Sequence, residues 1–214
     1  MNNKTLEIYK KTLCLTNFQR EVLVGTLLGD AGIPKKSNNS FGFFNPSVKF
    51  EQKLASKDYI NHLYLIFKDW VDSPPKIRDI DVGKDTFRQS IWFKTYSHPS
   101  FVFYYNQFYG SFGGKKSISF FLMKNITSVS IAYWYMDGGS FNKRDNTFVL
   151  HTQSFSYADL IMLSDILSKK YSLRLNLHKD GKNWKLYIKK ESSVTFFNLI
   201  NPYILPCFYY KIGL

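Results

Sequence analysis

The stretch Leu23–Ala31, which reads Leu-Val-Gly-Thr-Leu-Leu-Gly-Asp-Ala, is an apolar run that places a carboxylate near its C-terminal end. Ile131–Gly139, which reads Ile-Ala-Tyr-Trp-Tyr-Met-Asp-Gly-Gly, repeats this pattern later in the chain. Thr16 with Gln19 predicts a capping box before the first run, and Thr127 predicts an N-cap before the second. Both runs are therefore predicted to be helices that end at an acidic residue.

Two glycines of the first run, Gly25 and Gly29, are four residues apart and share one helix face. Without Cβ atoms on that face, the backbone of a second helix can approach closely. We expect the two runs to pack side by side and to bring their acidic ends together at one edge of the protein. Carboxylates arranged in this way are suited to holding divalent metal ions.

Four further stretches and one lysine carry a resemblance along the rest of the chain. They are Asp69–Pro75, Lys115–Ile118, Val149–Phe155 and Asn198–Tyr203, followed by Lys211. Together with the two runs, these stretches resemble the LAGLIDADG homing endonucleases in the form that carries both motifs on one chain. They look like segments of a mitochondrial intron-encoded member of that family, in the same order, from the capping box to the C-terminus.

The order of the predicted elements also indicates an internal repeat. The first half is predicted to contain a motif helix, a strand at 48–54, a helix at 57–70 capped by Ser56, a hairpin at 76–96 and a helix at 100–109. The second half repeats this order with elements at 128–137, 147–153, 157–171, 173–189 and 192–201. We therefore expect an α+β fold of two αββαββα halves, residues 1–114 and 115–214, related by a pseudo-two-fold axis with the motif helices at their interface.

Each half is expected to contribute one antiparallel sheet with helices on one face and polar side chains on the other. The candidate DNA-binding residues on these free faces are Arg78, Arg88, Gln89, Lys94, Arg174, Asn176, Lys185 and Lys189. Alternating polarity more often marks an ordinary solvated strand face. Arginine, lysine, asparagine and glutamine suit base edges in the DNA major groove. With the motifs present, we expect two sheet saddles on a long double-stranded DNA target.

The resemblance implies a metal-dependent catalytic centre at the motif ends. Asp30 stands at the eighth motif position, where the metal-binding acid of the family belongs. In the second copy that position is Gly138, and Asp137 comes one residue early, since Met-Asp-Gly-Gly replaces the usual Met-Asp-Asp-Gly. Asp30, Asp137 and Gly138 are thus the positions implied for two or more Mg²⁺ ions, for which Ca²⁺ or Mn²⁺ can substitute in a crystal. One of the two expected carboxylates is missing.

Lys116 and Lys211 match basic residues that lie beside the scissile phosphates in the family, which implies a catalytic role. The simpler alternative is that both only bind phosphates within a basic surface. Gln52 and Gln153, near the ends of corresponding strands, are candidates for positioning water. One helix step turns Asp137 by about a hundred degrees from the family direction, so its role as a metal ligand is the weaker expectation.

The composition fits a folded, basic protein. The 214 residues carry a formal charge of +13, from 29 basic and 16 acidic side chains, and both halves are basic. Distributed positive charge suits a phosphate backbone, although a generally basic organellar protein would look similar. Abundant Lys, Asn and Phe suggest AT-rich codons, as in a mitochondrion or chloroplast. Cys14 and Cys207 match no zinc spacing and are expected to be buried free thiols, and no membrane span is expected.

Three interpretations follow from Gly138. The chain is an endonuclease for intron mobility that is disabled at one position, a cleavage-deficient maturase that binds intron RNA and assists group I splicing, or a nicking enzyme that relies on Asp30 and Asp137. In each case we expect a monomer.

Overall fold

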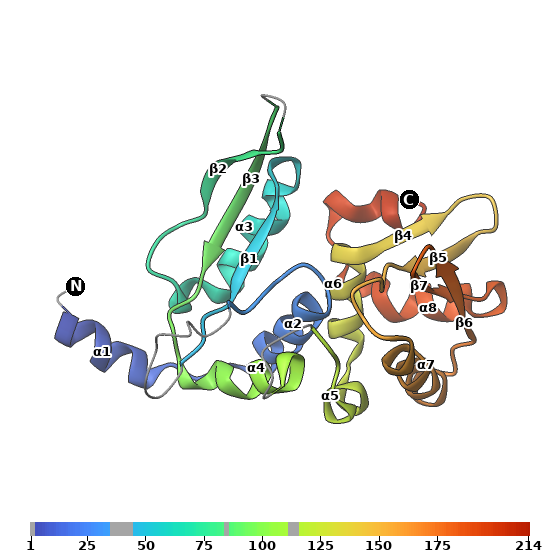
Figure 1. Cartoon of the computed structure of the whole chain (residues 1–214), viewed down its shortest axis with the longest axis horizontal. Helices are drawn as coiled ribbons and strands as arrows, with labels where there is room; N and C mark the ends of the chain where they lie inside the picture. Colours follow the sequence, from blue (N-terminus) through green and yellow to red (C-terminus); the bar gives the residue numbers. More distant parts are fainter. Residues whose placement is uncertain (1–2, 35–44, 84–85, 111–115) are drawn as a thin grey trace. The chain divides into compact units, whose positions relative to one another are not determined.

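The computed structural model describes residues 3–34, 45–83, 86–110 and 116–214 (Figure 1). It divides into two compact units, of which the first contains residues 1–20 and 30–105 and the second contains residues 21–29 and 106–214. Helix α2 (Asn17–Leu28) therefore contributes its first turn to one unit and the rest to the other. The predicted boundary between the halves, at residues 114 and 115, lies outside the described residues.

The first unit is built on a three-stranded antiparallel sheet. Its elements are α1 (Asn3–Thr12), β1 (Lys49–Lys53), α3 (Lys57–Phe67), β2 (Lys76–Asp81), β3 (Phe87–Lys94) and the start of α4 (Val102–Tyr109), with short 3₁₀ turns at Leu54–Ser56, Lys68–Trp70 and Pro99–Phe101. The strand order is β1-β3-β2. Helix α3 packs on one face, where the ring of Phe50 stacks on Phe67 and Phe93 at centroid distances of 5.2 and 4.8 Å.

The second unit contains the full predicted order of one αββαββα half. These elements are α6 (Ser128–Gly138), β4 (Gly139–Asn142), β5 (Thr147–Leu150), α7 (Tyr157–Tyr171), β6 (Leu175–Asp180), β7 (Asn183–Ile188) and α8 (Ser193–Ile200), preceded by α5 (Phe120–Asn125), with 3₁₀ turns at Lys190–Ser192, Asn201–Tyr203 and Pro206–Lys211. The antiparallel strand order is β4-β5-β7-β6 (Figure 1). An aromatic cluster of Tyr135, Phe148 and Phe196 joins α6, β5 and α8 in its core.

The two motif helices pack closely inside the second unit, as the glycine spacing predicts. A Cβ atom at Gly25 would collide with the carbonyl of Ser130 and with Tyr133, and one at Gly29 would collide with the side chain of Asp137. Real Cβ atoms do not approach other heavy atoms so closely, so glycine is needed at both positions. The hydroxyl of Ser130 also donates to the carbonyl of Glu21 at 3.0 Å.

Of the three predicted helix caps, two form in the structure and one does not. The capping box is confirmed, because the backbone N–H of Gln19 donates to Thr16 Oγ1 at 3.1 Å and that of Thr16 donates to Gln19 Oε1 at 3.0 Å. Thr127 caps α6 by accepting from the N–H of Ser130 at 3.2 Å. Ser56 makes no side-chain capping bond, since the 3₁₀ turn before α3 runs directly into the helix.

Several predicted features differ in detail. The strand predicted at 147–153 ends at Leu150, where the chain turns away from the sheet. No residue range was predicted for α5 or for β4, the first strand of the αββαββα order, since β4 has only four residues and begins on a motif glycine. The thiols of Cys14 and Cys207 are exposed, so the prediction that they are buried was wrong.

Candidate active site

The first motif ends at an exposed carboxylate. Asp30 follows the last helical residue, Leu28, by two positions, and the amide of Gln52 donates to Asp30 Oδ2 at 2.8 Å. Gln52 thus orients the carboxylate. Both lie at a polar hollow of about 330 Å³ in the first unit, which is lined by Asp30, Glu51, Gln52, Lys53, Ile80, Arg88, Gln89 and Ser90.

The second motif ends at Gly138, the last residue of α6. Its carbonyl accepts from the backbone N–H of His151 at 2.7 Å. Among the described residues, a Cβ atom at Gly138 would meet only the carbonyl oxygen of His151, at 3.5 Å, which is an ordinary contact. The backbone here does not have positive φ. A Cβ atom therefore fits at this position, in contrast to Gly139, where a Cβ would collide with the ring of Tyr135.

Two lysines bind the carbonyls at the motif ends within the second unit. Lys116 Nζ donates to the carbonyl of Gly29 at 3.0 Å. Lys211 Nζ donates to the carbonyl of Met136 at 2.6 Å and contacts that of Asp137 at 3.3 Å. A cation at the C-terminal end of a helix is favourable because it offsets the helix dipole. The structure thus places both predicted lysines where α2 and α6 end.

A second polar group surrounds the end of β5. The amide of Gln153 donates to Asp180 Oδ2 at 2.9 Å, and Lys185 Nζ pairs with the same oxygen at 3.0 Å. His151 Nε2 lies 3.0 Å from Ser140 Oγ. Partial burial lowers the pKa of His151, and the positive charges of Lys185 and Lys211 lower it further. Gln153 therefore binds Asp180, an acid that was not among the predicted site residues.

The strand register decides which predicted residues share the free face of the first sheet. Phe50 and Phe93 face α3, so the residues that alternate with them face away from it. The basic residues on that free face are Lys49, Lys53, Lys76, Arg78, Arg88 and Lys94. Gln89 alternates with Arg88 onto the other face, where its amide donates to Asp79 at 3.1 Å.

The predicted residues of the second sheet share one face. Leu186 and Ile188 are buried, so Lys185 and Tyr187 point to the opposite face. Asn176 lies across from Tyr187 on that face, and Arg174 and Lys189 continue the same alternation just beyond the strands. The ring of His178 stacks on Tyr187 at 4.0 Å between centroids.

The donor set at Asp30 fits a divalent cation only in a limited form. In the described part of the chain, no three His, Cys, Asp or Glu side chains come together. Mg²⁺ is commonly bound through one or two carboxylates, together with water and phosphate oxygens. The exposed carboxylate of Asp30 meets that requirement once a phosphate is present. Gly138 has no side-chain oxygen, and the side chain of Asp137 packs against Gly29.

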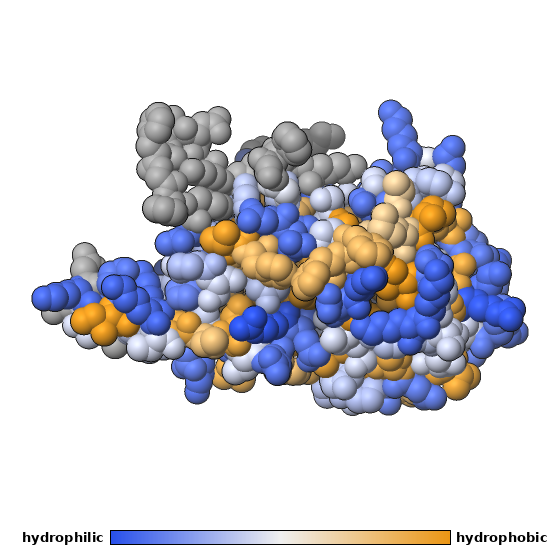
Figure 2. Space-filling model, turned by 90° about the horizontal axis from the view of Figure 1, so that it is seen from below, coloured by the Kyte–Doolittle hydropathy of each residue, from blue (hydrophilic) through white to orange (hydrophobic). Residues whose placement is uncertain are grey.

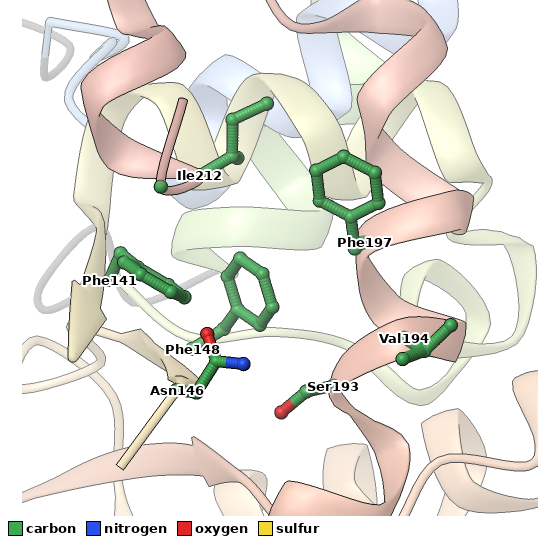
Figure 3. Close-up of a pocket in the computed structure, with 8 residues that line it drawn as sticks. Phe141, Asn146, Phe148, Ser193, Val194, Phe197 and Ile212 are labelled. Atoms are coloured by element: carbon green, nitrogen blue, oxygen red, sulfur yellow. The ribbon is translucent and has the colours of Figure 1, made fainter. Parts of the chain in front are cut away.

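An apolar cavity of about 200 Å³ lies elsewhere in the second unit (Figure 3). Phe141, Phe148, Phe197 and Ile212 surround it, with the polar groups of Asn146 and Ser193 at one side (Figure 3). No charged side chain is among the described residues that line it. Such a cavity has no group for phosphodiester chemistry, so the candidate site is at the motif ends.

The surface is mixed in character. On the face in Figure 2, hydrophobic residues (orange) occur in small groups among hydrophilic ones (blue). Across the whole surface, exposed apolar side chains include Phe120 and Phe121 of α5 and Ile161 of α7. Among the helices that the structure describes, none has both the length and the apolar character needed to cross a membrane.

Two antiparallel sheets with basic faces, and two glycine-packed helices with a carboxylate at one end, define the architecture of a two-motif DNA endonuclease. The sequence profile of the LAGLIDADG DNA endonuclease family matches residues 20–196. The chain belongs to this family, and the predicted family and α+β fold are confirmed.

Individual relatives agree with this assignment. The chain is 33% identical over 223 aligned residues to probable intron-encoded endonuclease 1 of Wickerhamomyces canadensis, covering 99% of this chain and 91% of that protein. The solved structure of the homing endonuclease I-WcaI bound to its DNA recognition sequence matches with a TM-score of 0.87 and 31% identity, over 99% of this chain and 93% of the other. The cytochrome b mRNA maturase bI2 of Saccharomyces cerevisiae is 26% identical over 202 residues, which are 90% of this chain and 46% of the maturase.

Proposed function

We propose that this chain is a monomeric, intron-encoded protein that recognises a long double-stranded DNA target and retains only one of two cleavage carboxylates. The observation that carries the proposal is the contrast between the motif ends. Asp30 presents an exposed carboxylate held by Gln52, whereas Gly138 presents none. The basic faces of both sheets, and relatives named as intron-encoded endonucleases, support DNA as the ligand.

The remaining chemistry is phosphodiester hydrolysis at the first motif end. A divalent cation at Asp30, Mg²⁺ by the donor type, would supply charge stabilisation and a more acidic water. Gln52 keeps the carboxylate in one orientation by its hydrogen bond. Lys116 and Lys211 place fixed positive charge at the two motif ends, where it favours a phosphate whose negative charge grows during the reaction.

Loss of one principal catalytic group commonly lowers a rate by several orders of magnitude. We therefore expect the chain to bind its target specifically and to cut at most one strand at an appreciable rate. Double-strand cleavage is expected to be restored by Gly138→Asp, because a Cβ atom fits at this position and the substitution supplies the second carboxylate.

The test compares the unchanged chain, Gly138→Asp and Gly138→Asn on supercoiled plasmids that carry the intron-free host gene, in Mg²⁺. Nicking yields open circles and double-strand cleavage yields linear plasmid. Only Gly138→Asp should linearise the plasmid, while the isosteric Gly138→Asn controls for size. Equal linearisation by all three would refute the proposal that double-strand cleavage needs a carboxylate at position 138. Absence of specific binding by all three would refute the DNA-binding role.

A second function is favoured by a specific observation. The similarity to a cytochrome b mRNA maturase covers 90% of this chain, and a maturase has no need of the missing carboxylate. We propose it as the alternative: the chain binds intron RNA in a mitochondrion or chloroplast and assists splicing. This function would be favoured over the first by three results together. The chain would bind the intron RNA tightly, it would show no Mg²⁺-dependent cleavage, and it would bind no DNA sequence selectively.

A further inference from the structure

One acidic side chain, Glu51, lies within the basic free face of the first sheet. The residues of β1, β2 and β3 that alternate onto this face include six basic side chains, and Glu51 is the acid among them. A carboxylate on a surface that is meant to follow phosphates is unfavourable by itself. Its place on this face therefore requires a separate explanation.

The contacts of Glu51 supply that explanation. Arg78 donates from Nε to Oε1 at 2.8 Å and from Nη2 to Oε2 at 2.9 Å, and Nη2 also lies 2.7 Å from Oε1, so the carboxylate binds the side edge of the guanidinium. Ser90 Oγ donates to Oε1 at 2.7 Å, and Lys49 Nζ donates to Oε2 at 2.6 Å. These three partners surround the side chain of Glu51, which is 22% exposed.

Glu51 is ionised at neutral pH. Partial burial alone would raise the pKa of Glu51, but the hydrogen bonds from Lys49, Ser90 and Arg78 outweigh it and lower that pKa to about 2. Charge-assisted hydrogen bonds between a guanidinium and a carboxylate are among the stronger ones in proteins. The Glu51 carboxylate is thus charged, and able to hold Arg78, at neutral pH.

The pairing leaves one edge of Arg78 for a ligand. A guanidinium has five N–H donors in a fixed plane, and the Glu51 carboxylate uses the edge formed by Nε and Nη2. The end edge, formed by Nη1 and the remaining N–H of Nη2, keeps its donors. The Arg78 side chain is 47% exposed, so that edge is accessible. Two parallel donors of this kind match O6 and N7 of guanine in the major groove.

We propose that Glu51 is a positioning residue that sets base specificity, by holding Arg78 so that its end edge recognises a guanine at one position of the DNA target. This rests on the DNA binding proposed above. Without Glu51, Arg78 has many rotamers and can donate its hydrogen bonds equally well to a phosphate, which carries no sequence information. With Glu51, the Arg78 side chain is already ordered before DNA binds, so the cost of ordering it does not oppose binding.

The second sheet provides a matched comparison. Asp180 also lies on the free face, but it holds Lys185 at 3.0 Å and the amide of Gln153. A lysine ammonium is a compact charge without a planar fork, so holding it does not create a bidentate reader of guanine. Removing the charge of Asp180 is therefore not expected to relax a guanine preference.

The experiment is selection of bound duplexes from a randomised DNA library, with the base preference measured at every position. The proteins are the unchanged chain, Glu51→Gln, Arg78→Lys, Arg78→Ala and the double variant Glu51→Gln/Arg78→Ala, with Asp180→Asn as the control. At one position a guanine preference should fall about tenfold in Glu51→Gln and in both Arg78 variants. The double variant should match Arg78→Ala, because the two side chains act as one unit.

Arg78→Lys guards against loss of folding, since it keeps the charge of an exposed side chain. If Glu51→Gln binds all sequences more tightly with an unchanged pattern of preferences, Glu51 only restrains Arg78 and the inference is overturned. If the unchanged chain itself enriches no sequence, the proposed DNA function fails, and the role of Glu51 fails with it. Enrichment by the unchanged chain with no change in Glu51→Gln overturns the role of Glu51 alone.

Discussion

The two motif helices are alike in packing and different in chemistry. Gly25 and Gly29 are required, because a Cβ atom at either would collide with residues of α6. Gly138 is not required, since a Cβ there would meet only an ordinary contact among the described residues. The first motif ends in an exposed Asp30 and the second in a glycine. The fold therefore does not explain the missing carboxylate, and packing and catalysis are separable at this position.

Other parts of the second motif end remain in place. Lys211 still donates to the carbonyl of Met136, and the hydroxyl of Tyr135 holds the backbone of Lys211 at 2.6 Å. His151 still joins its backbone to that of Gly138. Because these groups are fixed by contacts that do not involve a side chain at 138, a single substitution is expected to be sufficient to restore the second centre.

The largest expected effect breaks the contrast between the motif ends. Asp30→Asn keeps the size of the side chain and its hydrogen bond with Gln52, but it removes the negative charge. We expect the nicking activity proposed above for the chain to fall on the order of a thousandfold. Rates on duplexes labelled on one strand or the other measure this loss and show which strand is cut.

Asp79→Asn is the matched control for Asp30→Asn, since Asp79 is exposed in the same unit and pairs with the amide of Gln89. Its cleavage rate should stay close to that of the unchanged chain. Retained nicking in Asp30→Asn on the same strand would show that the cleaving carboxylate is elsewhere, and Asp137 would be the next residue to test.

A smaller effect sharpens the packing side of the comparison. Gly25→Ala forces a methyl group against the carbonyl of Ser130, so we expect a loss of about 2 kcal/mol in the free energy of unfolding. For a chain of this size, that corresponds to a melting temperature lower by roughly 4–8 °C. Calorimetry or denaturant unfolding measures both quantities.

Gly138→Ala is the control for Gly25→Ala. Alanine is favoured over glycine in a helix by about 0.5–1 kcal/mol, and nothing among the described residues obstructs it. Gly138→Ala should therefore be as stable as the unchanged chain or slightly more so, without gaining cleavage. A loss at Gly138→Ala as large as that at Gly25→Ala would mean that the second motif needs its glycine for packing.

The fold could be predicted from the sequence wherever a signal was local. The Thr16–Gln19 capping box and the N-cap at Thr127 both form. Helix α7 has the predicted bounds, Tyr157–Tyr171, and the structure adds its cap, since the side chain of Ser156 accepts from the backbone N–H of Asp159. Strand β4 lacked such a signal, since four residues beginning with glycine show too little alternation to identify a strand.

The candidate site was less predictable because its partners are distant in sequence. The pairs Gln52–Asp30 and Gln153–Asp180 join residues more than twenty positions apart. Arg88 and Gln89 were both expected on the free face, although neighbouring residues of a strand must point to opposite faces. Composition and alternation identify polar strands, but only the register shows which side chains meet.

The smallest expected effect compares the acids on the free faces of the two sheets, Glu51 and Asp180. The pKa of Glu51 in the folded chain is about 2, below its ordinary value near 4.5, so its contribution to stability is complete above pH 4.5 and is lost as the pH falls toward 2. After allowance for solvent screening, this contribution is about 1 kcal/mol. Glu51→Gln should therefore flatten the decline in stability between pH 5 and pH 2, as measured by chemical unfolding at each pH.

Asp180 also has a lowered pKa, through Gln153 and then Lys185, but it lies in water, so Asp180→Asn should flatten the decline less. An equal change in both variants would mean that the enclosure of Glu51 by Lys49, Arg78 and Ser90 adds nothing to an ordinary surface pair, and the firm hold on Arg78 would lose its physical basis.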